Sequence, residues 1–217
     1  PGVIICCTIE LSAAGREDGQ QVAQNPYIRK AYEAIVSQDY NQAAGWFAKA
    51  VEQEPDNAAH HYRYSITLAR SDKLAKALEH AELAVTLEPD SALYRMHLDM
   101  LKARRLLGEA DGLLSESGPD SLEAAVARLE EATRLDPLSV EALLVLAEAC
   151  RRTGRTDKAL RAVTDALKLD PGHREATHLL EQLRNAKREH TETGGASTHG
   201  KGNHSGGRHR RRRQNGP

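Results

Sequence analysis

The residues of this chain that could do chemistry are few, and they form no catalytic constellation. The sequence has no G-x-S-x-G, no H-E-x-x-H and no glycine-rich phosphate loop before a helix. Cys150 is the candidate nucleophile, yet it occupies an inner position of a periodic apolar segment, where a free cysteine behaves as a small hydrophobe. We therefore interpret Cys150 as a packing residue and expect the protein not to be an enzyme.

Histidines are the second group that could bind a ligand. His60 and His61 are adjacent, so on a helix their side chains point about 100° apart and cannot share a metal. His173 and His178 are five residues apart, which is also a poor chelating interval. Four more histidines lie in a Gly-rich stretch that could hold a transition metal loosely: His190, His199, His204 and His209. Such stretches are usually solvated chain ends, so we expect no metal and no cofactor.

An arginine cluster near the end of the sequence is the sharpest charged feature. It contains Arg208, Arg210, Arg211, Arg212 and Arg213. A dense basic cluster can bind nucleic acid or an anionic lipid surface by releasing counterions. The alternative is a solvated tail that folds back on an acidic body, and we favour it because no aromatic residue interleaves the arginines for base stacking.

The charge of the chain is divided between an acidic body and this basic tail. Residues 190–217 hold six basic residues and one acid, a net charge of +5, which leaves −6 for residues 1–189 out of the total of −1. We expect 189–217 to be disordered because it lacks the apolar content to offset the entropy of ordering. No apolar run reaches the length of a membrane span and no disulfide framework is implied, so a cytoplasmic location is the expectation.

The elements that would position these residues follow a fixed period. Four prolines, Pro55, Pro89, Pro137 and Pro171, stand 34, 48 and 34 residues apart, with alanines five and twelve residues before each. Fixed spacing of this kind, in an Ala- and Leu-rich body without alternating segments, predicts a helical repeat array. Arrays of this type usually build binding surfaces.

These repeats resemble the tetratricopeptide repeat family, whose pattern is W-x2-L-G-x2-Y, then A-x3-F, then P. The fourth repeat reads Leu143-x2-Leu146-Ala147-x2-Cys150, Ala159-x3-Val163 and Pro171. The second reads His61-x2-Tyr64-Ser65-x2-Leu68, Ala77-x3-Ala81 and Pro89, and the first reads Tyr27-x2-Lys30-Ala31-x2-Ala34, Ala43-x3-Phe47 and Pro55. The resemblance covers about residues 25–188.

The resemblance implies an all-α fold: an α-solenoid, a right-handed superhelix of about four helix-turn-helix repeats plus a C-terminal capping helix. The expected units are 25–57, 58–91, 92–139 and 140–173, with the capping helix at 174–188. Residues 1–24 are expected to be disordered or to pack over Trp46. Asp56, Asp90 and Ser139 are the expected N-caps of the helices that follow the prolines.

Within each unit, small residues are needed where the two helices cross. The expected facing positions are Ala31, Ser65 and Ala147 against Ala43, Ala77 and Ala159. Larger residues, Phe47, Leu129 and Val163, should fill the space between units.

The third unit is irregular because 48 residues rather than 34 separate its prolines. We expect a first helix over Ala92 to about Leu107 and then an inserted loop from Gly108 through Gly118, with room for a short turn at Leu113-Leu114. Asp120 should then start the next helix as an N-cap, with Glu123 completing a capping box.

The resemblance also implies where a partner would bind, because the first helices of such arrays line a concave face. Carried over by phase, the candidate peptide-binding residues are Ile28, Tyr32, Tyr62, Arg63, Ile66, Arg70, Met96, Met100, Arg104, Leu144 and Arg151, with Arg152 beside them. This apolar, arginine-rimmed groove would suit a peptide with apolar anchors and acidic flanks. All eight aromatics lie between Tyr27 and Tyr94, which favours the first half of the array.

The sequence therefore predicts a non-catalytic scaffold that binds a peptide or protein in its groove. Two alternatives stay open: an adaptor whose basic tail binds nucleic acid or an anionic surface, and the C-terminal repeat region of a longer enzyme or membrane protein. The co-chaperone clamp for a C-terminal carboxylate is not matched, since its positions hold Ile28, Tyr32, Arg63, Leu93 and His97, with one cation.

Overall fold

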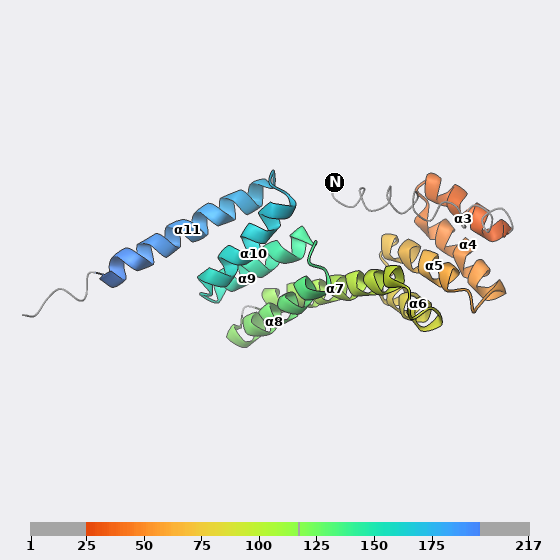
Figure 1. Ribbon diagram of the computed structural model, residues 1–217, viewed down its shortest axis with the longest axis horizontal. Coiled ribbons are helices and arrows are strands. Elements are labelled where there is room, and N and C mark those ends of the chain that lie inside the picture. The colour runs from red at the N-terminus through yellow and green to blue at the C-terminus, as the bar shows by residue number, and fades with distance from the viewer. Residues whose placement is uncertain (1–24, 117, 196–217) are drawn as a thin grey trace, which may run out of the picture.

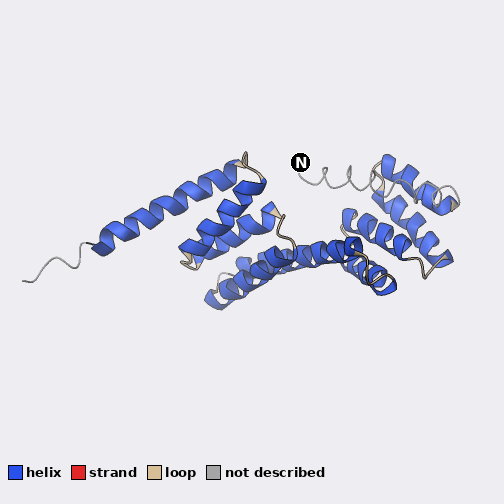
Figure 2. Ribbon diagram, viewed as in Figure 1, coloured by secondary structure: helices blue, strands red, loops and turns tan. Residues whose placement is uncertain are grey.

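A computed structural model describes residues 25–116 and 118–195, and this part of the chain is built from α-helices with no strand (Figure 2). The predicted all-α class is therefore confirmed. The helices are α3 (Pro26–Val36), α4 (Tyr40–Gln53), α5 (Ala58–Arg70), α6 (Leu74–Leu87), α7 (Ala92–Ser115), α8 (Pro119–Leu135), α9 (Val140–Arg152), α10 (Thr156–Leu169) and α11 (Arg174–Gly195).

The helices are stacked in chain order. Each packs mainly against the helix before it and the helix after it, with the tightest association inside the pairs α3–α4, α5–α6, α7–α8 and α9–α10. Figure 1 shows the result as an arch, with α3 and α4 at one end, α7 and α8 in the middle and α11 at the other end. This nearest-neighbour stacking is the arrangement of an α-solenoid, in which stability comes from neighbouring units.

The crossing of the two helices within a pair depends on small side chains. All six predicted crossing residues are fully buried: Ala31, Ala43, Ser65, Ala77, Ala147 and Ala159. Ser65 also donates a hydrogen bond from Oγ to the backbone oxygen of Ala77, 2.7 Å away. The larger residues expected between units, Phe47, Leu129 and Val163, are buried as well.

The second helix of every pair ends two residues before its proline, at Gln53, Leu87, Leu135 and Leu169. Proline disfavours helical backbone in the residue before it, which explains the common end point. The next helix starts with a polar cap. Ser139 caps α9 as predicted, but α5 and α7 are capped by Asn57 and Ser91, one residue after the expected Asp56 and Asp90.

The third pair corrects the sequence-based expectation most strongly. The segment from Gly108 was expected to be a loop, but α7 continues through it to Ser115. Ala110 is buried in this extension and Leu113 and Leu114 pack against the same core cluster, and packing of this kind offsets the cost of about 1 kcal/mol for each glycine in a helix. The insertion has therefore lengthened the helix pair.

The start of α8 also differs from the prediction. Its N-cap is Gly118, which makes no side-chain capping bond, and Pro119 occupies the first helical position. Proline suits that position because its missing N–H would have no helical partner there. Asp120 is thus inside the helix, and the expected capping box with Glu123 is not formed.

The core is divided into clusters along the array, and α7 contributes to several of them. Near its start, Leu98 and Leu101 pack with residues of α4, α5 and α6. Farther along, Leu107 and Ala110 join the cluster that continues through α8, α9, α10 and α11. One continuous helix therefore connects the two halves of the arch.

The last described helix, α11, covers the end of the array. Ala176, Leu179 and Leu183 are buried against the preceding unit. The helix continues to Gly195, so residues 189–195, which composition predicted to be disordered, are helical. The N-terminal flank at 1–24 and the arginine cluster at 208–213 lie outside the described residues.

Candidate functional site

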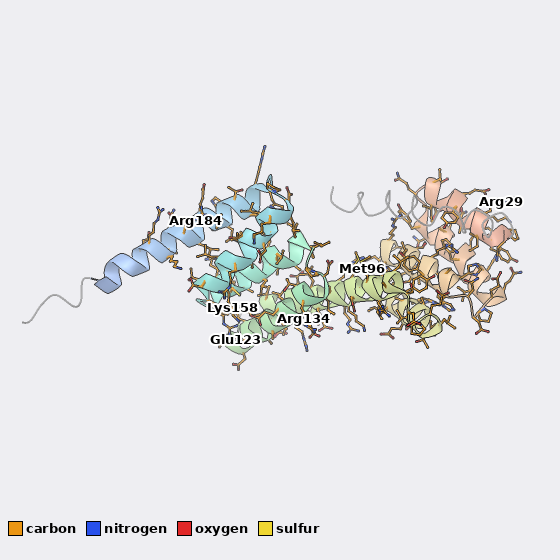
Figure 3. All side chains as sticks on the ribbon, viewed as in Figure 1. Arg29, Met96, Glu123, Arg134, Lys158 and Arg184 are labelled. Atoms are coloured by element: carbon orange, nitrogen blue, oxygen red, sulfur yellow. The ribbon has the colours of Figure 1, made fainter. Side chains whose placement is uncertain are left out.

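The most open apolar surface at the predicted groove positions lies on α7. Leu93, Met96 and Met100 follow one another at helical spacing and are 39%, 55% and 38% exposed. Their spacing places them on one face of the helix. We call these three residues the α7 stripe. Figure 3 labels Met96, on the helix at the middle of the arch.

Aromatic contacts join α7 to the preceding first helix, α5. The Tyr62 ring of α5 lies 4.9 Å from the Tyr94 ring and 5.1 Å, edge to face, from the His97 ring, measured between centroids. Tyr62 therefore packs against the part of α7 that carries Tyr94 and His97, within one residue in sequence of Leu93 and Met96. Ile66 on α5 and Leu144 on α9 are half-buried.

The first repeat contributes less open surface than its sequence indicated. Ile28 is only 1% exposed and packs in a core cluster with Ala31, Phe47 and Ala50. Tyr32 is half-buried, with its ring edge to face against Phe47 at 6.0 Å. Ile28 is thus a core residue, and Tyr32 keeps part of its surface exposed.

Two arginines of the predicted rim lie inside the array. Arg63 is buried in α5. The guanidinium of Arg70 lies over the ring of Tyr40, 5.6 Å from its centroid, at the start of α4. Both side chains therefore serve contacts within the first two pairs.

Three further arginines also have intramolecular partners. Arg104 donates to the backbone oxygen of Ala69 at 2.9 Å and to Asp72 at 3.2 Å. Arg151 makes a two-pronged bond to Glu148 at 2.7 and 2.6 Å, which raises the pKa of the guanidinium. Arg152 donates to the backbone oxygen of Leu114 at 3.3 Å.

Three of these arginines occupy the same phase, fifteen residues after successive prolines: Arg70, Arg104 and Arg152. Each reaches back to the preceding pair: Arg70 to the Tyr40 ring at the start of α4, Arg104 to the last turn of α5 and Arg152 to the last turn of α7. Cations beside the carboxyl end of a helix interact favourably with its exposed carbonyls. Their shared phase was visible in the sequence, but their role as links between repeats was not recognised there.

His97 of α7 contacts both Tyr62 and Ser65 of α5. Its Nε2 lies 2.9 Å from Ser65 Oγ; because that hydroxyl already donates to Ala77, the imidazole is the donor. Burial lowers the pKa of His97 to about 4. The ring is therefore neutral near pH 7, and it adds no charge beside Tyr62.

The other chemical candidates are accounted for by packing. Cys150 is fully buried as a free thiol, and burial raises its pKa, which disfavours the nucleophilic thiolate. Across residues 25–116 and 118–195, no group of three or more histidine, cysteine, aspartate or glutamate side chains could hold a metal ion.

None of the described helices is long and apolar enough to span a bilayer.

Comparison with known proteins gives one related sequence and many similar folds. TPR repeat-containing protein YpiA of Bacillus subtilis is 26% identical over 156 residues, and the match covers 72% of this chain and 33% of YpiA. The chain thus spans about a third of that relative. A MamA protein from Desulfovibrio magneticus RS-1 aligns with a TM-score of 0.48 at 15% identity, covering 78% of this chain and 88% of that one.

A second solved structure is that of YrrB, a TPR protein described as having an unusual peptide-binding site. It aligns with a TM-score of 0.43 at 19% identity and covers 81% of this chain and 86% of its own. The family model for the tetratricopeptide repeat matches residues 28–92 and 121–174, which is more than half of the sequence. With its paired helices, its buried small residues at the crossings of three of these pairs and this match, the chain belongs to the tetratricopeptide repeat family.

Proposed function

We propose that the protein is a non-catalytic scaffold whose groove binds a peptide segment of a protein partner through apolar anchors. The family supports a role as a protein-interaction scaffold in general. The peptide groove is the more specific proposal. The observation that carries it is the α7 stripe, three large apolar side chains left open at the middle of the array.

The chemistry of the α7 stripe suits a peptide anchor. Two of its three residues are methionines, whose flexible, polarizable side chains adapt to different apolar partners. Tyr62 adds an aromatic edge, and aromatic residues are frequent in the regions of an interface that contribute most binding energy. An apolar side chain of the partner would lie on the α7 stripe.

The expected acidic flanks become a secondary part of this proposal. Arg104 and Arg151 already bond to groups of their own chain, so a partner carboxylate would have to compete with Asp72 or Glu148. Apolar contact with the α7 stripe therefore contributes most of the affinity we propose. Binding of an anionic surface or nucleic acid by the arginines of 208–213 stays a prediction from sequence.

The proposal can be tested with a random peptide library displayed on phage and selected against the full chain. The enriched peptides should carry apolar anchors, and Met96→Glu with Met100→Glu should weaken their binding at least tenfold, because two charges would replace the apolar contact. Leu138→Glu is the matched control, since Leu138 is 73% exposed but lies between α8 and α9. Peptides that bind the double variant as tightly as the unmodified chain would refute the groove.

A further inference from the structure

The second pair of helices contains a compact cluster of rings between α5 and α6. His61 Nδ1 lies 2.9 Å from His80 Nδ1, and His61 Nε2 lies 2.8 Å from the backbone oxygen of Pro55, to which it donates. The His80 ring also contacts the Tyr64 ring, with centroids 4.4 Å apart. Three rings thus fill the space beneath the turn at Pro55.

The fourth pair has smaller side chains at the same positions. Counting one full repeat interval of 34 and one of 48 residues, His61, Tyr64 and His80 correspond to Leu143, Leu146 and Ala162. Here the structure has a pocket of about 580 Å³ between α8, α9 and α10. The main difference is that a methyl group at Ala162 stands where α6 carries an imidazole.

The floor of this pocket is apolar. It is formed by Leu143, Leu146, Cys150 and Ala162, and Leu169 lies at its edge. The Cys150 thiol stays protonated because burial raises its pKa. A ligand would therefore contact hydrocarbon and a neutral thiol, and its binding would be non-covalent.

The edge of the pocket carries three cations and two acids. Lys158 of α10 reaches across to Glu130 of α8 at 2.7 Å, and Lys168 pairs with Asp165 at 2.7 Å. Figure 3 labels Lys158 on its helix. The two acids are thus each neutralised by a lysine.

Arg161 is the remaining charge at the edge. Among the described residues it has no carboxylate within 4.0 Å, and Asp157, which feels its field, is already held by Lys187 at 2.6 Å. In the second pair the same position is Glu79. The pocket of the fourth pair therefore combines an apolar floor with one available cation.

We propose that this pocket binds a small amphipathic monoanion, such as a medium-chain carboxylate, with its apolar body on the floor and its anionic group at Arg161. The volume is within the range of about 300–1,000 Å³ that is usual for small-molecule sites. A charge-assisted bond to a guanidinium is stronger than a neutral hydrogen bond, which explains the choice of an anion. The pocket shares no residue with the groove, so this site is independent of peptide binding.

The test uses the full chain and the fluorescent anion 8-anilinonaphthalene-1-sulfonate, which has an apolar aromatic body and one sulfonate. We expect saturable binding that octanoate displaces at least tenfold more effectively than octanol does. Ala162→Phe, which fills the pocket, and Arg161→Glu, which reverses its charge, should each raise the Kd of the probe at least tenfold.

Two matched controls separate this site from other surfaces. Arg134→Glu makes the same charge change at an exposed residue of α8, and it should leave the Kd within twofold. Met96→Glu should do the same, because it alters the groove alone; loss of probe binding in that variant would place the probe at the α7 stripe and overturn the proposal.

Folding of each variant is checked by circular dichroism. If Ala162→Phe does not fold, Ala162→His takes its place, since α6 accommodates histidine at the corresponding position. Probe binding that survives filling of the pocket, or that is indifferent to Arg161→Glu, would show that the pocket is not the site. If the unmodified chain does not bind the probe at millimolar concentration, the proposal is also refuted.

Discussion

Arg104 of α7 joins its own repeat to the preceding one by donating a hydrogen bond from Nη1 to the backbone oxygen of Ala69, 2.9 Å away in the last turn of α5. Its second nitrogen reaches Asp72 in the turn that follows. One planar side chain therefore satisfies a helix-end carbonyl and a carboxylate together. Neither contact is local in sequence, so both stabilise the stacking of neighbouring units.

Replacing Arg104 with alanine should lower the free energy of unfolding by about 1 kcal/mol, since hydrogen bonds from charged groups stabilise but this side chain is half-exposed. Lysine should not restore the loss, because a single ammonium lacks the planar fork that reaches both acceptors. Urea denaturation measures the effect. Arg134→Ala, which removes only a local surface pair with Glu131, is the control and should change stability by less than about 0.5 kcal/mol.

Glycine in the extension of α7 gives a second prediction. A Cβ built on Gly112 meets nothing within 4 Å, and its position is helical, so Gly112→Ala should stabilise the protein by about 0.5–1 kcal/mol. Gly154 also has open space but has φ +72°, where an L side chain is strained. Gly154→Ala should therefore destabilise the chain in the same thermal unfolding measurement. Equal effects of the two changes would contradict the helical assignment at Gly112.

The caps predict a contrast between two helix starts. Ser139 Oγ accepts a hydrogen bond from the Ala142 amide at 3.2 Å, so Ser139→Ala should cost about 1 kcal/mol of stability. Lys73 stands at the same kind of position before α6 but makes no capping bond. Lys73→Ala removes only an exposed hydrogen bond from Nζ to Asn41, so it should cost less than about 0.5 kcal/mol, as judged from denaturation midpoints at equal slope.

Acid should destabilise the array through its buried histidines. Burial lowers the pKa of His97 from 6.5 to about 4, so the unfolded chain binds the proton at a higher pH than the folded chain. The stability that depends on neutral His97 is present above pH 6.5 and is lost as the pH falls towards 4. Between pH 7.5 and 5.0 the wild type should lose up to about 2 kcal/mol more than His97→Gln.

His178→Gln serves as the comparison for that experiment, because His178 is exposed on α11. It should retain the full pH dependence of the wild type. Parallel curves for wild type and His97→Gln would show that His97 does not contribute to acid sensitivity.

The repeat period was sufficient to predict the fold, and the reason lies in the crossings. Ser65 and Ala77 can meet only if their helices cross closely, and equivalent small pairs recur in the first and fourth units. The tract from Gly108 was less predictable because local propensity and tertiary packing disagree there. Two glycines indicate a loop, whereas Leu107 and Ala110 gain more from packing in a helix.

Residue positions within the repeat do not determine how exposed a side chain is or how fully it fills the space around it, as the candidate peptide-binding residues and the pocket show. Phase placed Ile28 and Met96 in equivalent roles, yet Ile28 lies in the core and Met96 is open. The pocket at Ala162 depends on side-chain volumes from three helices, two of them in a different unit from the third. The combined volume of side chains from two units cannot be read from the sequence pattern of one repeat.

The length of α7 determines how the two halves of the array can respond to a ligand. One helix carries both Met96, in the α7 stripe, and Leu107, in the core of the second half. The two residues are eleven positions apart, about 16 Å along the helix axis. A continuous helix transmits a tilt over that distance without a hinge. A ligand that tilted α7 at the α7 stripe would therefore also shift the half of the array that packs around Leu107.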